Sequence, residues 1–260
     1  MTSKFSILLG TAVLAFAGPS PIAAHDLGEL HSFHCLHGCP IGTPDIDDIV
    51  VREIYTLASN DLTKFADWVA YRITPDTIGP SGARAWQADP WLTGDETLEP
   101  ADYDDASVPL GIDRGHQAPL AAFSGTPFKA DTNILSNITP QGSALNQAPW
   151  QFLEAKENAL AKAEKIAVYV LTGPLYERMM PKLPKADERH RVPSGYWKVI
   201  ATTDGRLAAF IMDTAAPRDL KYCAARVTLD EVELRARLGL FPRLEKRLFL
   251  DLSPSLGCAI

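Results

Sequence analysis

The sequence predicts an α+β fold with a central, mainly antiparallel sheet flanked by helices. Residues 196–213 indicate a hairpin, because two apolar runs flank Asp204 and Gly205, a pair favoured in two-residue turns. Residues 228–239 indicate a helix with a capping box formed by Thr228 and Glu231, and with Gly239 as its end. Strands and helices in mixed order, with hairpins, are typical of α+β proteins.

The other elements follow in chain order. Residues 63–74 combine an apolar helical face with a strand-like end, and residues 165–174 are typical of a buried strand that stops at Gly173 and Pro174. Between them, the chain from Trp150 onward has helical periodicity and is rich in Ala, Leu, Glu and Lys. Proline is tolerated in the first turn of a helix, so Pro149 places the helix start near Asn146, and Asn is a favoured N-cap residue.

Composition limits the function classes. The chain has 260 residues, of which 46% are hydrophobic and 22% are charged, and this suits one large domain or two small ones. The formal net charge of -7 argues against a protein that coats nucleic acid through charge alone, although it leaves room for a local basic cleft.

Residues 1–24 have the pattern of a secretory signal peptide. Lys4 precedes an apolar run that is too short to span a bilayer, and cleavage is expected after Ala17 or, preferably, after Ala24. No later segment is apolar enough for a membrane helix. We therefore expect a secreted, soluble protein whose mature part, residues 25–260, is a single domain.

The expected export affects how the four cysteines, Cys35, Cys39, Cys223 and Cys258, are interpreted. An even number in an oxidising compartment favours disulfides, with three possible connectivities. The first two are close enough in sequence for a small loop, which leaves the third to hold the C-terminal tail. The alternative is a zinc site that also uses His31, His34 and His37, but a second ligand pair with zinc spacing is missing from the sequence.

The stretch GIDRGHQAPL, residues 111–120, contains the first candidate catalytic residues. Hydrolysis of a phosphodiester needs cations that offset charge and a base that activates water. Arg114 offers a fork of donors to a phosphate, and the pKa range of histidine suits His116 as a base. An oxygen ligand at the helix start, such as Asn146, suits Mg²⁺, and Glu154 follows about 80° round the helix, on the same flank.

Taken singly, each of these residues has an ordinary explanation, but their spacing resembles a known family. The motif DRGHQAPLA is followed by LSNITPQ, by LNQ, by W and LE, and then by TGPLYER, KLP and YWKVI, with WVAYRIT, RAWQADP and LEPADY upstream. This order is similar to that of the DNA/RNA non-specific endonuclease family, whose active site is a ββα-metal motif. The similarity extends from the first cysteine pair to Cys258.

The resemblance implies a role for each matching residue. His116 would be the general base, and Asn146 the sole direct protein ligand of a hydrated Mg²⁺, with Mn²⁺ as a substitute. Glu154 would hold a water of that ion. Arg84 would bind and neutralise the scissile phosphate, and Arg114 would support the phosphate and the geometry of the site.

The resemblance has further implications. Asn137 and Gln141 fall where the family has polar residues near the cleft, so we expect them to bind substrate. A similar family member has an arginine one helical turn after the position of Glu154, where this chain has Asn158, and a phosphate contact is therefore expected to be missing. The implied disulfides are Cys35–Cys39 and Cys223–Cys258.

The resemblance also predicts the reaction: cleavage of DNA and RNA to products with 5′-phosphates, with a homodimer as the assembly. Two alternatives stay open on the residues alone. One is a catalytically idle nucleic-acid-binding protein on the same fold, and the other is a phosphodiesterase for small molecules.

Overall fold

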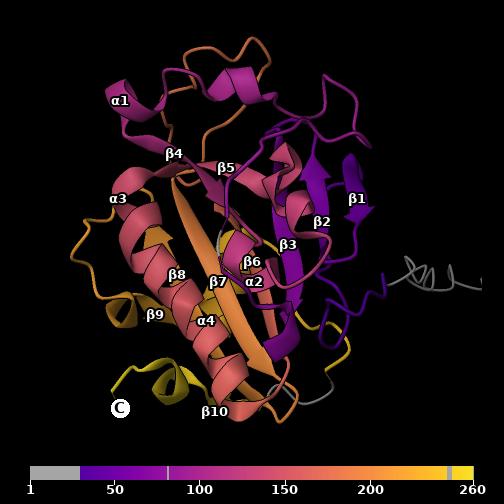
Figure 1. Cartoon of the computed structure of the whole chain (residues 1–260), viewed down its shortest axis with the longest axis vertical. Coiled ribbons are helices and arrows are strands. Elements are labelled where there is room, and N and C mark those ends of the chain that lie inside the picture. Colours follow the sequence, from indigo (N-terminus) through magenta and orange to yellow (C-terminus); the bar gives the residue numbers. More distant parts are fainter. Residues whose placement is uncertain (1–29, 81, 245–247, 260) are drawn as a thin grey trace, which may run out of the picture.

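The computed structural model describes residues 30–80, 82–244 and 248–259, so the predicted signal peptide lies outside the described residues. The centre of the described part is an eight-stranded sheet with the order β1-β2-β3-β6-β7-β8-β10, in which β9 also pairs with β8 (Figure 1). Its strands are β1 Asp47–Val51, β2 Tyr55–Asn60, β3 Phe65–Ile73, β6 Val168–Leu175, β7 Gly195–Thr202, β8 Arg206–Asp213, β9 Arg226–Val227 and β10 Leu250–Asp251. Every pairing in it is antiparallel except that of β10 with β8.

A second, two-stranded sheet and the helices surround this centre. The small sheet pairs β4 Ile112–His116 with β5 Ile138–Gly142. The α-helices are α1 Ser107–Leu110, α2 Leu120–Phe123, α3 Ser143–Leu145, α4 Gln151–Glu164 and α5 Leu229–Ala236, and a π-helical turn, Asn146–Trp150, joins α3 to α4. Short 3₁₀ turns lie at Pro75–Thr77, Pro100–Tyr103, Lys129–Asn133, Leu135–Asn137, Tyr222–Ala225 and Ser253–Leu256.

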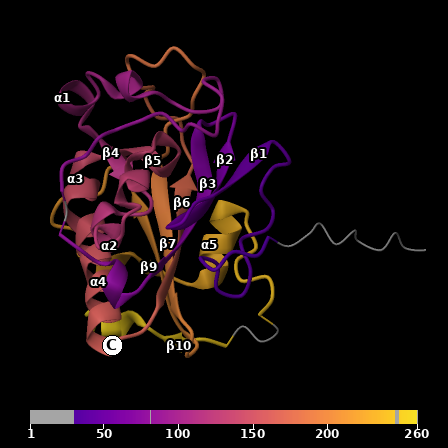
Figure 2. The same ribbon diagram turned by 45° about the vertical axis from the view of Figure 1, so that its right-hand side comes forward.

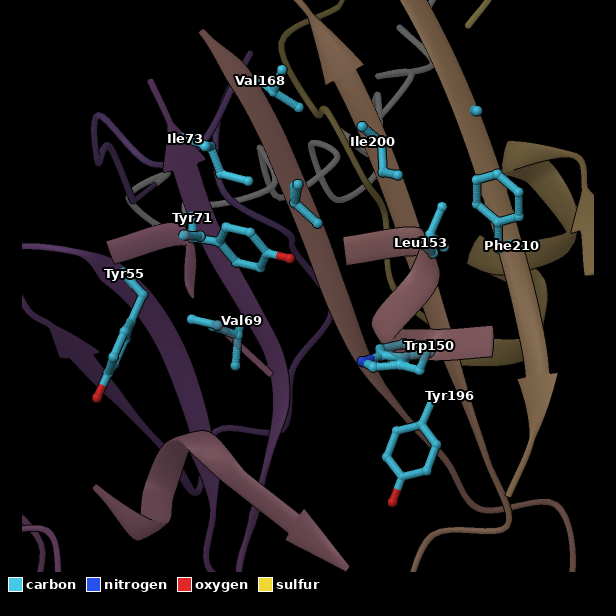
Figure 3. Close-up of a cluster of buried hydrophobic side chains, with 14 of the residues drawn as sticks. Tyr55, Val69, Tyr71, Ile73, Trp150, Leu153, Val168, Tyr196, Ile200 and Phe210 are labelled. Atoms are coloured by element: carbon cyan, nitrogen blue, oxygen red, sulfur yellow. The ribbon is translucent and has the colours of Figure 1, made fainter. Parts of the chain in front are cut away.

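The helices cover both faces of the large sheet. In Figure 2, α4 lies on one side of the sheet and α5 on the other. Because successive side chains of a strand point to opposite faces, β3 sends Val69, Tyr71 and Ile73 into the core under α4, which Figure 3 shows, and Trp68 and Ala70 into the core under α5. This two-sided burial confirms the predicted α+β architecture.

The predicted elements are mostly present, with three differences at their bounds. Residues 63–74 contain no helix, because β3 is buried on both faces and its apolar residues fill two cores. Strand β6 continues to Leu175 rather than stopping at Gly173. Pro174 is tolerated there because its strand is by then paired only with β7, the pairing with β3 having ended at Thr172.

The third difference is at helix α5. Its start is as predicted, since the Thr228 hydroxyl accepts a hydrogen bond from the Glu231 amide at 3.1 Å. Its end is not: the helix stops at Ala236, because Arg237 adopts a left-handed conformation with φ of 59°, two residues before Gly239. Gly239 instead forms a β-bridge with Ile41.

The cysteines form the two expected disulfides, Cys35–Cys39 and Cys223–Cys258. Neither Cys35 nor Cys39 therefore offers a thiolate to zinc. Buried His34 donates and accepts within the protein, with Ser32, Thr56 and the Glu53 carbonyl as its partners. Among the described residues, no helix has the length and apolar character that crossing a membrane requires.

Candidate active site

The small sheet and the helix that follows it form one cleft. Strand β4 carries Arg114 and His116, β5 pairs with it antiparallel, and the chain then enters α3, the π-helical turn and α4. A cleft of about 550 Å³ lies between these elements and the segment that contains Arg84. Strand β4, the π-helical turn, α4 and the segment of Arg84 all contribute lining residues, which include Arg84, Arg114, His116, Asn146, Glu154 and Asn158.

His116 has one nitrogen bound and one available. Its Nε2 lies 3.1 Å from Oδ1 of Asn133, and since that oxygen can only accept, Nε2 carries the proton and Nδ1 is the basic nitrogen. Burial lowers the pKa of His116 to about 4; the bond to Asn133 opposes this shift and the charge of Arg84 adds to it. The imidazole is therefore neutral at pH 7, which is the form that a general base requires.

Asn146 is oriented by Asp113 and does not cap the helix. The chain is already helical from Ser143, and Asn146 itself has helical dihedral angles, φ of -57° and ψ of -45°, so the N-cap prediction is wrong. Its amide nitrogen donates to Oδ2 of Asp113 at 2.9 Å. Because the carboxylate oxygen accepts, the NH₂ group faces Asp113 and the amide oxygen of Asn146 is left for another partner.

The same carboxylate fixes the local backbone. Asp113 also accepts from the Ser143 hydroxyl at 2.6 Å and from the Gln147 amide at 2.8 Å. One side chain of β4 thus holds both α3 and the π-helical turn. The wide turn also accommodates Pro149, which lacks an N–H and whose ring would crowd the preceding turn of a regular α-helix.

Glu154 lies at the base of the cleft on α4, with its side chain 16% exposed. Its Oε1 lies 3.5 Å from Nζ of Lys198, an ion-pair distance without a hydrogen bond of ordinary geometry. Burial raises the pKa of Glu154 to about 7, against the lowering effect of the Lys198 ammonium and with a further rise from the Glu157 carboxylate.

The two arginines differ in how firmly they are held. Arg114 donates to the Pro100 carbonyl at 2.7 Å, and its guanidinium lies 5.7 Å from the ring centre of Trp86 and 5.3 Å from that of Tyr103. Arg84 is exposed, and in the described part of the chain no carboxylate forms an ion pair with it. An anion in the cleft can therefore contact the fixed guanidinium of Arg114 and the more mobile side chain of Arg84.

Asn137 and Gln141 lie outside the cleft, contrary to expectation. The Asn137 side chain is fully buried and bonds the backbone of Ala118 and Thr132, so it ties the start of β5 to the segment after β4. Gln141 is 1% exposed and packs against Gly115, where an added Cβ would lie 2.6 Å from its Cβ and Oε1. The family resemblance suggested substrate binding for both, and their burial leaves neither side chain facing the cleft.

Three residues of the site were not predicted. Asp113 stands within the DRGH motif, so its place beside Arg114 and His116 was a signal that could have been used. Trp86 gave a similar signal, since it stands in the RAWQADP motif two residues after Arg84, and its ring lies 5.3 Å from the imidazole; Asn133, which bonds His116 from a 3₁₀ turn, gave none. Both contacts arise only from tertiary folding.

Comparison with known proteins agrees with this geometry. The family model for DNA/RNA non-specific endonucleases matches residues 38–246. A nuclease of Serratia marcescens is 45% identical over 236 residues, which are 89% of this chain and 87% of that protein. The mitochondrial endonuclease G of Homo sapiens is 34% identical over 140 residues, 52% of this chain and 45% of that protein.

A solved structure agrees in fold. A chain of the EndoG/EndoGI complex superposes with a TM-score of 0.68 at 23% identity, over 81% of this chain and 92% of that chain. The ββα cleft, the family match over most of the sequence and the similar relatives lead to one conclusion. The chain belongs to the DNA/RNA non-specific endonuclease family, a family of metal-dependent phosphodiester hydrolases.

Proposed function

We propose that this chain is a secreted, Mg²⁺-dependent endonuclease that hydrolyses DNA and RNA to fragments with 5′-phosphates, with His116 as its general base. One observation carries the proposal. A neutral imidazole with an available Nδ1, an oriented amide oxygen, a carboxylate and two arginines line the same cleft. These are the groups that attack by water on a phosphodiester requires.

Each residue has a separate task in the reaction. Arg84 and Arg114 hold the phosphate and offset its charge. Nδ1 of His116 accepts the proton of the attacking water, while Asn133 keeps Nε2 protonated and the ring in place. The negative charge of a bound phosphate favours the protonated imidazole and so raises the basicity of His116 above that in the free enzyme.

The oxygen donors of the cleft fit a hard divalent cation. Asn146 offers an amide oxygen, and the partly exposed carboxylate of Glu154 lines the same cleft. Mg²⁺ prefers oxygen ligands and keeps several of its waters, so Asn146 would bind it directly and Glu154 would bind one of those waters. When bound, the ion supplies positive charge that stabilises the transition state and the leaving oxygen.

The reaction class is tested with a supercoiled plasmid and an RNA, each incubated with Mg²⁺, with Mn²⁺ and with EDTA. We expect cleavage of both nucleic acids with either metal and none with EDTA. His116→Ala should lose about 10²–10⁴-fold in turnover while folding and binding nucleic acid normally. Near-normal turnover of that variant would refute the base assignment. Turnover of bis(p-nitrophenyl) phosphate without nucleic-acid cleavage would favour a small-molecule phosphodiesterase.

The metal ligand is tested with Asn146→Ala against Gln147→Ala. Both variants remove an amide that donates to Oδ2 of Asp113, so each loses one hydrogen bond to the same carboxylate oxygen. Only the first should abolish activity or shift it to high Mg²⁺ concentration. Equal Mg²⁺ dependence of the two variants would leave Asn146 as a structural residue.

Export and assembly belong to the same proposal. The signal-peptide pattern and the two disulfides both support secretion, and N-terminal sequencing of the exported protein distinguishes cleavage after Ala17 from cleavage after Ala24. The homodimer that the family resemblance implies stays a prediction, which light scattering of the purified protein tests.

A further inference from the structure

A buried charged cluster lies directly beneath the cleft, where α4 packs on the large sheet. It consists of Tyr71 from β3, Glu154 and Glu157 from α4, and Lys198 from β7. Lys198, Glu157 and Tyr71 are all fully buried, and only Glu154 reaches the cleft. A buried lysine in a central strand is strongly unfavourable unless its charge is compensated, so its presence calls for an explanation.

The contacts form a chain that leads to Glu154. The Tyr71 hydroxyl donates to Oε2 of Glu157 at 2.9 Å and accepts from Nζ of Lys198 at 3.3 Å. The same Nζ lies 3.0 Å from Oε1 of Glu157 and 3.5 Å from Oε1 of Glu154. Figure 3 shows the Tyr71 hydroxyl directed across the face of the sheet toward the side on which Trp150 and Leu153 lie. The ammonium thus joins a carboxylate that is sealed in the core to one that faces the cleft.

The alternation of strand β7 fixes the direction of the Lys198 side chain. Side chains two apart in a strand share a face, so β7 presents Lys198 between buried Tyr196 and Ile200, which both belong to the core under α4. The Nζ also lies 4.5 Å from the ring centre of Trp150, in the π-helical turn. Lys198 therefore contacts both the π-helical turn, through Trp150, and α4, through Glu154 and Glu157, from a position in the centre of the sheet.

We propose that Lys198 is a positioning residue for the metal site, and that Glu157 and Tyr71 hold its ammonium so that the Glu154 carboxylate is fixed toward the cleft. The proposal rests on the proposed role of Glu154. Two carboxylates face one ammonium in the cluster, and of the two only Glu154 faces the cleft. A hydrated divalent cation in the cleft would add positive charge beside the Glu154 carboxylate, which shares the Lys198 ammonium with Glu157.

The proposal is tested by removing the ammonium without leaving a buried charge alone. Two double variants do so, Lys198→Met with Glu157→Leu and Lys198→Met with Glu157→Gln. The first replaces the buried ion pair with apolar groups of similar volume, which is often neutral or stabilising, and the second keeps an acceptor for the Tyr71 hydroxyl. Thr172→Val is the matched control, since Thr172 pairs with Lys198 across the sheet and is equally buried but uncharged. Melting temperature establishes that each variant folds.

The main readout is Mn²⁺ binding measured by calorimetry, which does not depend on turnover. We expect the dissociation constant to rise about 10–100-fold in the double variants, as for other outer-shell changes, and less than about threefold in the control. In steady-state kinetics, the Mn²⁺ concentration for half-maximal rate should rise more than kcat falls. In a Glu154→Gln background, the same double change should have no further effect on Mn²⁺ binding.

The outcomes separate this inference from the proposed function. If Glu154→Gln itself leaves Mn²⁺ affinity unchanged, the proposed metal site is wrong. If Glu154→Gln weakens binding but the double variants bind as the parent does, or if the two losses add, then Lys198 has no positioning role. On the unaltered protein, Mg²⁺ titration should shift the NMR signal of the buried Lys198 side chain, and an unmoved signal at saturating Mg²⁺ would overturn the inference as well.

Discussion

Asp113→Asn should impair metal binding although it preserves the size of the side chain. The Asp113 carboxylate accepts from Ser143, Asn146 and Gln147, at 2.6, 2.9 and 2.8 Å respectively. An amide has one accepting oxygen and one donating NH₂ group. At the Oδ1 position the Ser143 hydroxyl can turn to accept from that NH₂ group, but at the Oδ2 position the NH₂ group would face the two amide donors of Asn146 and Gln147. In either orientation the negative charge that strengthens these hydrogen bonds is lost. If the NH₂ group replaces Oδ2, Asn146 relieves the clash by turning its own amide, and its NH₂ group then points where the metal ligand should be.

The size of the effect follows from the hydrogen bonds that the substitution breaks. Removing an outer-shell partner of a metal ligand typically costs 10–100-fold in metal affinity or activity, and we expect the Mg²⁺ concentration for half-maximal plasmid cleavage to rise by about that factor. Hydrogen bonds to a charged group contribute roughly 1.5–3 kcal/mol each when buried, and partial exposure places the stability loss near the lower end. Thermal unfolding and an Mg²⁺ titration of the rate measure the two effects.

Ser143→Ala is the control for this prediction. It removes the bond to Oδ1 and leaves both bonds to Oδ2, including that of Asn146. We expect a loss of stability with an unchanged Mg²⁺ requirement. Should Asp113→Asn show the same Mg²⁺ requirement as the parent, Asp113 would only stabilise the fold and the orientation of Asn146 would have another cause.

Three further predictions concern other parts of the chain. Gly115→Ala places a Cβ 2.6 Å from the Cβ of Gln141 and should cost about 1–3 kcal/mol, a loss that Gln141→Gly, which removes that Cβ, should partly relieve in denaturant unfolding. Burial lowers the pKa of His34 from 6.5 to about 4, so the unfolded chain binds a proton at a higher pH than the folded chain does. The free energy of unfolding should therefore fall by about 2 kcal/mol between pH 7 and pH 5, and His34→Gln should abolish this part of the pH dependence. Asn158→Arg adds a cation to the cleft and should lower KM for an oligonucleotide several-fold at low salt, a gain that kinetics at high salt should reduce if charge is its cause.

Local patterns in the sequence predicted the fold and much of the site. The hairpin of β7 and β8 and the start of α5 at Thr228 depend on neighbouring residues, and both are present. The cleft residues His116, Asn146 and Glu154 were predicted from residue chemistry, from the helical spacing of the last two and from the family resemblance, and all three line one cleft. Patterns of this kind are informative because the residues that decide them are close in sequence.

The errors have a common physical cause. Asn146 has the residue type and the proline spacing of an N-cap, but Asp113 draws three side chains together and extends the helix backward to Ser143. Asn137 and Gln141 are polar yet buried, with Asn137 satisfying backbone groups. In each case a partner that is distant in sequence decides the outcome, and residue type carries no information about that partner.

The order Asp-Arg-Gly-His in β4 follows from the alternation of a strand. Arg114 and His116 are two apart, and both contact the Trp86 ring, so the cation and the base face the same aromatic wall. Asp113 and Gly115 lie on the other face of the strand. Asp113 holds the turn that carries Asn146, and Gly115 leaves room for Gln141. A shift of one residue would exchange the two sets, pointing the base into the core and the carboxylate away from the ligand it orients. The chemistry of the cleft is therefore tied to four consecutive residues, and the glycine among them is as constrained as the histidine.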